Sequence, residues 1–169
     1  MLAASLVVSP ATLPAPALAA PAENRAAPPT GGYLDQLLHE INGRRAMVGS
    51  PPLAYASSDA NAAVGQYLAD LTPWMAAMHT CFHGMYNPVA PGWDYVADSG
   101  LHAEARGEVI GCPMDGYQWT PQQVASSWWD SPAHFDSLYG DPEANVVACG
   151  AWGPGRRGFE AVACVTLKV

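Results

Sequence analysis

His134 lies in an aromatic-rich stretch, 128–135, that could hold it rigidly for chemistry. Ser131 is a favourable helix N-cap and Pro132 suits the first helical position. The pattern predicts a short helix ending at Gly140, with His134 in its first turn. Two imidazoles and a carboxylate can bind zinc and leave a position for water. Whether His134 meets such partners or simply packs depends on the elements around it.

The other four histidines lie in different surroundings. His79 and His83 are four residues apart, so on a helix they would share a face. The segment between them lacks the glutamate of H-E-x-x-H, which excludes a zinc-protease interpretation. His39 is expected on the surface of an amphipathic helix, and His102 in a loop.

Composition limits the classes of function. The chain has 169 residues, which favours one domain, and half of them are hydrophobic, which allows a core. The net charge is −8, so phosphates would be repelled and no nucleic-acid partner is expected. The sequence contains neither a G-x-S-x-G elbow nor a Gly-rich nucleotide loop.

The N-terminal region predicts export. The apolar run at 2–8 is too short to span a bilayer, and 17–19 match a small-residue cleavage pattern, although a basic n-region is missing. We predict a signal peptide at 1–19 and a disordered Ala/Pro-rich segment at 20–32. Residues 33–169 are predicted to form a secreted or cell-envelope domain without a transmembrane segment.

Four cysteines agree with export and predict two disulfides. Their spacing lacks the close pairs typical of zinc ligands. Cys149 and Cys164 flank a Gly/Pro-rich turn at 153–158, and two strands joined there would bring them face to face. We predict the pairs Cys149–Cys164 and, by elimination, Cys81–Cys112, each contributing roughly 2–4 kcal/mol. The alternative is four free buried thiols.

Hydrophobic periodicity predicts helices, a short strand and a C-terminal hairpin. A first helix is expected at 33–48, a second from Ser58 or Asp59 to about Leu71, and a third after a capping box formed by Thr120 and Gln123. Strands are expected at 107–110, 145–152 and 159–169. Thr72-Pro73 is expected to end the second helix. The order predicts a layered α+β domain with helices packed on an antiparallel sheet, and the irregular span 73–106 is of a length often linked to function.

Five motifs then occur in one order. The first helix contains L-x-x-I-N-x-x-R at 38–45, followed by Gly49-Ser50-Pro51-Pro52-Leu53. Later in the chain come Phe82-His83-Gly84, Gly107-Glu108-Val109, the stretch 128–134 and the strand at 145–150. Together they resemble bacterial members of the CAP superfamily, which contains cysteine-rich secretory proteins, antigen 5 and pathogenesis-related proteins. The resemblance covers residues 33–169.

The resemblance implies an α-β-α sandwich, with a central antiparallel sheet, helices on both faces and a shallow cleft. In some members histidines and glutamates of this cleft bind a divalent metal. His83 is preferred to His79 because an aromatic residue precedes it and glycine follows, as in the family. The expected cleft residues are His83, Glu108 and His134, with the two histidines as ligands of Zn or Mg. Asn42 and Arg45 are expected to hold the first helix to the sheet.

The chain also departs from the family pattern. Val109 replaces the asparagine of G-E-N, and Ala133 and Phe135 replace the glycine and arginine of G-H-R. The second glutamate is absent, and the region before His134 offers only Asp115 and Asp130. The site is therefore predicted to contain two histidines and one carboxylate.

Three functions follow as hypotheses. The first is a binding protein for a lipid or sterol, a cell-envelope component or another protein. The second is a metal-dependent hydrolase with His83 and His134 as ligands and Glu108 as base. The third is a structural module held by disulfides.

The six tryptophans could line a binding groove or pack in an ordinary core. Of the adjacent Trp128 and Trp129, one is expected in the core and the other beside the cleft.

Overall fold

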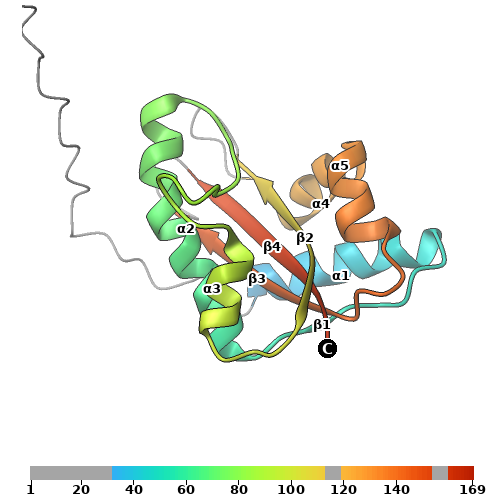
Figure 1. The fold of residues 1–169 in the computed structure, drawn as a ribbon. Helices are drawn as coiled ribbons and strands as arrows, with labels where there is room; N and C mark the ends of the chain where they lie inside the picture. The colour runs from blue at the N-terminus through green and yellow to red at the C-terminus, as the bar shows by residue number, and fades with distance from the viewer. Residues whose placement is uncertain (1–31, 113–118, 154–159) are drawn as a thin grey trace, which may run out of the picture.

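The computed structural model describes residues 32–112, 119–153 and 160–169 (Figure 1). The predicted signal peptide and residues 154–158 of the predicted turn lie outside these ranges. The elements are, in order, α1 (Gly32–Met47), β1 (Ala54–Tyr55), α2 (Ser58–Met78), α3 (Gly92–Asp98), β2 (Glu104–Gly111), α4 (Pro121–Trp129), α5 (Pro132–Phe135), the π-helix η1 (Asp136–Gly140), β3 (Val146–Trp152) and β4 (Ala161–Lys168).

The four strands form one sheet in the order β1-β3-β4-β2. The predicted hairpin is present, since β3 and β4 pair antiparallel, and β2 pairs antiparallel with β4. The expectation of a wholly antiparallel sheet needs one correction: the two-residue strand β1 pairs parallel with β3, with Ala54 opposite Val146. A strand this short leaves no alternation in the sequence to predict it.

Helices cover both faces of the sheet, which confirms the predicted α-β-α sandwich. Figure 1 shows α2 and α3 on one side of the strands and α1, α4 and α5 on the other. Each side has its own hydrophobic cluster against the sheet. Because β2 is an edge strand, the two helical layers can approach each other along its open edge.

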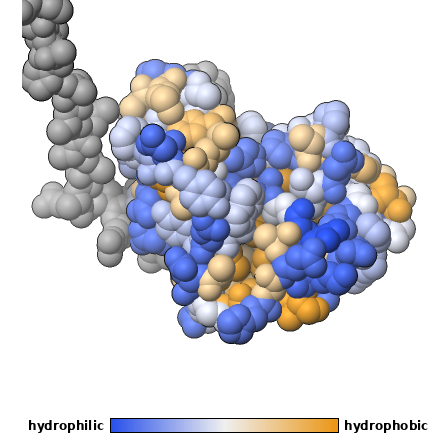
Figure 2. All heavy atoms as spheres, in the orientation of Figure 1, coloured by the Kyte–Doolittle hydropathy of each residue, from blue (hydrophilic) through white to orange (hydrophobic). Residues whose placement is uncertain are grey.

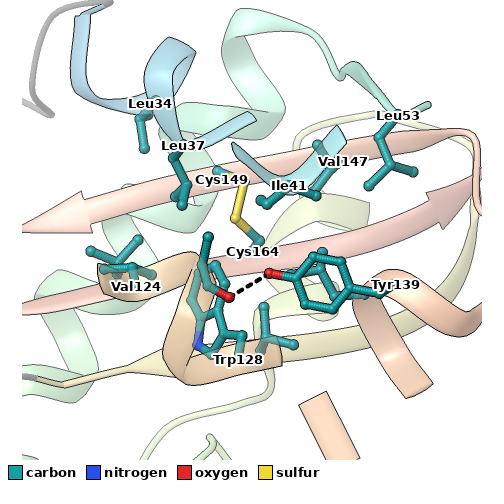
Figure 3. Packing of buried hydrophobic residues seen from close by; sticks show 14 of the residues in the cluster. Leu34, Leu37, Ile41, Leu53, Val124, Trp128, Tyr139, Val147, Cys149 and Cys164 are labelled. Atoms are coloured by element: carbon teal, nitrogen blue, oxygen red, sulfur yellow. Dashed lines mark hydrogen bonds between the residues drawn. A yellow bond between two sulfur atoms is a disulfide. The ribbon is translucent and has the colours of Figure 1, made fainter. Parts of the chain in front are cut away.

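The first helix packs as its periodicity predicts. Leu37 and Ile41 are fully buried, and Figure 3 shows them beside Trp128 and the Cys149–Cys164 disulfide. Asn42 accepts from the backbone N–H of Leu53 and donates to its carbonyl, at 2.8 and 2.9 Å.

Arg45, one turn further along α1, is also fully buried. Its guanidinium donates to four backbone carbonyls, those of Pro51, Leu138, Asp141 and Ala144. Burial lowers the pKa of this guanidinium. These bonds and those of Asn42 tie α1 to residues 51–53 and to the segment 138–144. Both segments lie outside the strands, so the expected direct attachment of α1 to the sheet is replaced by attachment to the segments before β1 and β3.

The predicted end of the second helix is wrong, because α2 continues through Pro73 to Met78. Proline lacks an N–H for the helical ladder, a loss that usually ends a helix. Here the residues around it hold the helix, since Leu71, Thr72 and Met75 are all buried. The N-cap of this helix is Ser57, one residue before the first of the two predicted caps, and its side chain accepts from the N–H of Ala60. Helix α3 lies within the span expected to be irregular.

The predicted capping of the shorter helices is complete at α4 and only partly present at α5. Thr120 and Gln123 form the reciprocal capping box of α4. Ser131 occupies the N-cap of α5 in an extended conformation, but its side chain makes no capping bond. The chain then continues into η1, which ends at Gly140 as predicted.

Both predicted disulfides are present. Cys149–Cys164 joins directly opposite residues of β3 and β4, and Cys81–Cys112 joins the segment after α2 to the end of β2. Among the described helices, none has the length and apolar character needed to cross a membrane. On the face seen in Figure 2, hydrophobic residues form separate small patches among hydrophilic ones.

Candidate functional site

Glu108 on β2 is the buried centre of the candidate site, with a side chain only 1% exposed. Its Oε1 accepts from the Tyr67 hydroxyl at 2.7 Å and lies 2.8 Å from His83 Nδ1. Its Oε2 accepts from the backbone N–H of Gly92 at 2.7 Å. A buried carboxylate needs such donors, because desolvation without them is costly. Glu108 therefore acts as a fixed acceptor around which three segments are ordered.

His83 comes from the segment that follows α2. The Cys81–Cys112 disulfide ties this segment to the strand that carries Glu108. One residue after His83, the N–H of Gly84 donates to the Tyr67 hydroxyl at 2.8 Å. The His83 ring is thereby held against Glu108, while its side chain remains 42% exposed.

His134 approaches from the other helical layer, on α5. Its ring centre lies 6.1 Å from that of His83, with the ring planes tilted by 45°. Burial first, and then the neighbouring His83, lower the pKa of His134 below its ordinary value of 6.5. At neutral pH His134 is therefore a neutral imidazole.

The hydrogen bond to Glu108 also selects the tautomer of His83. A carboxylate accepts only, so in the neutral ring Nδ1 carries the proton and Nε2 keeps a lone pair. The same carboxylate–histidine pairing orients imidazoles that ligate metals or accept protons. In its neutral form His83 thus offers the lone pair of Nε2, beside the neutral imidazole of His134.

The structure brings together all three residues predicted for the cleft: His83, Glu108 and His134. His79 is elsewhere: it is the left-handed C-cap of α2, with φ +48°, and is exposed. This position results from the extra turns of α2 beyond Pro73. His39 is exposed and His102 lies outside any helix or strand, as expected.

Sequence reasoning missed two contributors, Tyr67 and Gly92. Tyr67 lies on the buried side of α2 and is fully buried. A buried tyrosine hydroxyl requires a partner, and that requirement is the signal that could have found it. Burial first, and then the charge of Glu108, raise the pKa of Tyr67, so its hydroxyl stays protonated.

Gly92 contributes its backbone, and no sequence signal marks this role. A Cβ added there would lie 2.8 Å from Glu108 Oε2 and 3.1 Å from the ring of Tyr67. Glycine is thus the residue that lets the α3 backbone approach the carboxylate. Its N–H completes the set of donors to Glu108.

The donor set bears on the predicted metal. Within the described ranges, no group of three or more His, Cys, Asp or Glu side chains could hold a metal ion. Catalytic zinc sites usually have three protein ligands. This site offers two imidazoles, because the carboxylate of Glu108 is already hydrogen-bonded to Tyr67, His83 and Gly92. The arrangement fits two protein ligands, with other positions filled by water or a bound molecule.

The α-β-α sandwich, with two histidines and a buried glutamate at the edge of its sheet, defines the class as a CAP domain. The chain belongs to the cysteine-rich secretory protein family, whose model matches residues 38–166. Among curated protein sequences no significant match is found.

Solved structures show the same fold. An extracellular protein containing an SCP domain from Bacillus anthracis has 12% identity and a TM-score of 0.58, over 80% of this chain and 40% of that one. An outer surface protein from Borrelia burgdorferi has 11% identity and a TM-score of 0.58, over 80% and 91%. A cysteine-rich secretory protein from Staphylococcus aureus has 14% identity and a TM-score of 0.51, over 83% and 40%. This chain therefore spans less than half the length of the Bacillus and Staphylococcus proteins.

Proposed function

We propose that this protein acts outside the cytoplasm and works by binding a ligand at His83 and His134. Its two disulfides suit an oxidising compartment. The structural relatives are described as extracellular, outer-surface or secretory proteins. The predicted signal peptide at 1–19 agrees with this location.

The observation that carries the binding proposal is the 2.8 Å contact between His83 Nδ1 and Glu108. It directs the lone pair of His83 Nε2 away from the carboxylate, on a side chain that is 42% exposed. His134 adds a neutral imidazole beside it. Two neighbouring acceptors of this kind suit a ligand with hydroxyl or N–H donors. A sterol, a cell-envelope component or a protein segment can supply them.

The contacts of Glu108 favour binding over hydrolysis. A general base must reach the water that it deprotonates. Glu108 is buried, and its oxygens are engaged by Tyr67, His83 and Gly92. These contacts support a role for Glu108 in holding His83 over a role in activating water.

A divalent metal is the second candidate ligand, and the ring separation supports it. With Zn–N bonds of about 2.0–2.1 Å, two imidazoles on one ion have ring centres roughly 5–6 Å apart, close to the 6.1 Å found here. His83 and His134 would hold the ion, and Glu108 would fix His83 behind it. A bound ion would supply a Lewis acid that recruits a ligand atom.

Ligand retention and zinc titration of the purified full-length protein test the proposal. The double variant His83→Ala/His134→Ala is compared with His79→Ala/His102→Ala, which removes two exposed histidines elsewhere. Extracts of the native protein are analysed by mass spectrometry, and cholesterol and Zn2+ are titrated separately. We expect retention or saturable binding in the parent and the control, and its loss in the first variant. Binding that is absent from the parent, or equal in both variants, would refute the site.

A further inference from the structure

A hollow lies on the outer surface of α1, and none of its lining residues belongs to the site above. It has a volume of about 500 Å³, within the range of roughly 300–1,000 Å³ typical of small-molecule sites. Five lining residues come from α1 and one from the end of α4: His39, Glu40, Gly43, Arg44, Met47 and Trp129. We propose that this pocket binds a neutral saccharide.

Gly43 is the first sign that the hollow serves a ligand. It lies inside a sixteen-residue helix and is exposed, where glycine destabilises by roughly 0.5–1 kcal/mol relative to alanine. Its φ is not positive, and a Cβ built there meets nothing within 4 Å. Neither backbone conformation nor packing therefore requires glycine. What glycine does provide is open space in the floor of the pocket.

Trp129 forms an aromatic wall. Its neighbour Trp128 lies in the core, as expected for one of the two tryptophans. Phe135 and Tyr139 pack edge-on against Trp129, with ring centres 5.0 and 5.2 Å away. The half-buried indole is thus held in a fixed orientation. A rigid aromatic surface binds the C–H face of a sugar ring with little loss of side-chain entropy.

The polar groups of the pocket are also held in place. Arg44 Nη1 lies 2.8 Å from Glu40 Oε2, and Arg44 Nη2 donates to Ser126 Oγ at 2.7 Å. Acceptors and donors for hydroxyl groups therefore stand beside the indole, with His39 adding an imidazole. The Glu40–Arg44 pair has no net charge, which favours a neutral ligand over an anion or a cation. An apolar ring face with hydroxyls at its edge is the ligand chemistry that matches both parts.

The test is NMR titration of the full chain with chitotetraose, cellotetraose and maltotetraose. We expect at least one of them to shift the indole N–H resonance of Trp129 saturably at millimolar concentration, without shifting His83. Gly43→Gln fills the pocket and should weaken this binding about tenfold or more. Because Gly43→Gln removes a helix-destabilising glycine, it should fold at least as stably as the parent. Ala46→Gln adds the same bulk at an exposed position of α1 outside the pocket and should bind as the parent does.

Three results would overturn the proposal. The first is the absence of a saturable shift with all three sugars. The second is a shift that persists unchanged in Gly43→Gln. The third is a shift of Trp129 by decanoate alone, which would assign the pocket to an apolar chain.

Discussion

His83 Nδ1 lies 2.8 Å from Glu108 Oε1, although the two residues are 25 positions apart in the chain. The histidine is 42% exposed and the carboxylate only 1%. A buried, fully engaged acceptor thus holds an imidazole at the surface. This relationship makes Glu108 important for both folding and the orientation of His83, and it can be tested by substitution.

Glu108→Gln should destabilise the protein. The amide NH2 group of glutamine would replace an oxygen that accepts from donors. Gly92 loses its acceptor if the NH2 group takes the place of Oε2, and both Tyr67 and His83 lose theirs if it takes the place of Oε1. We expect a loss of roughly 1–3 kcal/mol in the free energy of unfolding, measured by urea denaturation. Glu104→Gln, on the same strand but 60% exposed, should change it by less than about 0.5 kcal/mol. Equal effects of the two substitutions would contradict the assigned role of Glu108.

The lowered pKa of His134 predicts a pH dependence of stability. The unfolded chain binds a proton at His134 more readily than the folded one, so the contribution of the neutral ring is complete above about pH 7. It should be lost as the pH falls through 6.5 toward the lower folded-state pKa. His134→Gln should remove this contribution and so flatten the plot of unfolding free energy against pH between about pH 7.5 and 5. His102→Gln, which changes an exposed histidine, should leave the plot as it is in the parent.

A second measurement separates the two causes of this shift. In His83→Ala the neighbouring imidazole is gone but burial remains, so the pKa of His134 should rise only part of the way toward its ordinary value. NMR titration of the ring proton of His134 gives the pKa directly. A full return to the ordinary value would show that burial is not the main cause.

The two disulfides should differ in their effect on the site. They close chain segments of 15 and 31 residues, so removal of either should cost roughly 3–4 kcal/mol. Cys81→Ala/Cys112→Ala should also release the His83 segment and broaden or shift the His83 ring resonances. Cys149→Ala/Cys164→Ala, the matched control, should leave those resonances unchanged while the protein is folded. If the two variants perturb His83 equally, the proposed tether is wrong.

Arg45→Met should be among the most destabilising changes in α1. Methionine fills much of the same volume but leaves four buried or half-buried carbonyls without their donor. We expect a loss of roughly 2–5 kcal/mol in chemical denaturation. Arg44→Met, which breaks a partly exposed ion pair with Glu40, should cost about 1 kcal/mol or less. The reverse order would contradict the structural role given to Arg45.

Elements governed by local rules were predictable from the sequence. The apolar face of α1, the capping box of Thr120 and Gln123, and the strands flanking the last turn all depend on residues a few positions apart. The Cys149–Cys164 pairing follows from the same hairpin. Local spacing is sufficient here because the interacting groups are near one another along the chain.

Elements that depend on distant contacts were missed. α2 continues through Pro73 because buried side chains on both sides of the proline, Leu71 before it and Met75 after it, pack in the core cluster that covers the sheet. β1 exists only through its parallel pairing with β3. Neither partner is adjacent in the sequence. Propensity alone therefore ended the helix too early and gave no sign of the strand.

For the site, the sequence by itself determined the residue types: two histidines, one glutamate and cysteines able to tether the His83 segment. Only the tertiary structure decided how they meet, with His83 against Glu108, His134 reaching across from the other helical layer, and Tyr67 and Gly92 completing the hydrogen bonds. The reason is physical. A buried carboxylate takes its donors from whichever segments the folded core brings within hydrogen-bond distance, and those segments are separated by up to 41 residues of chain.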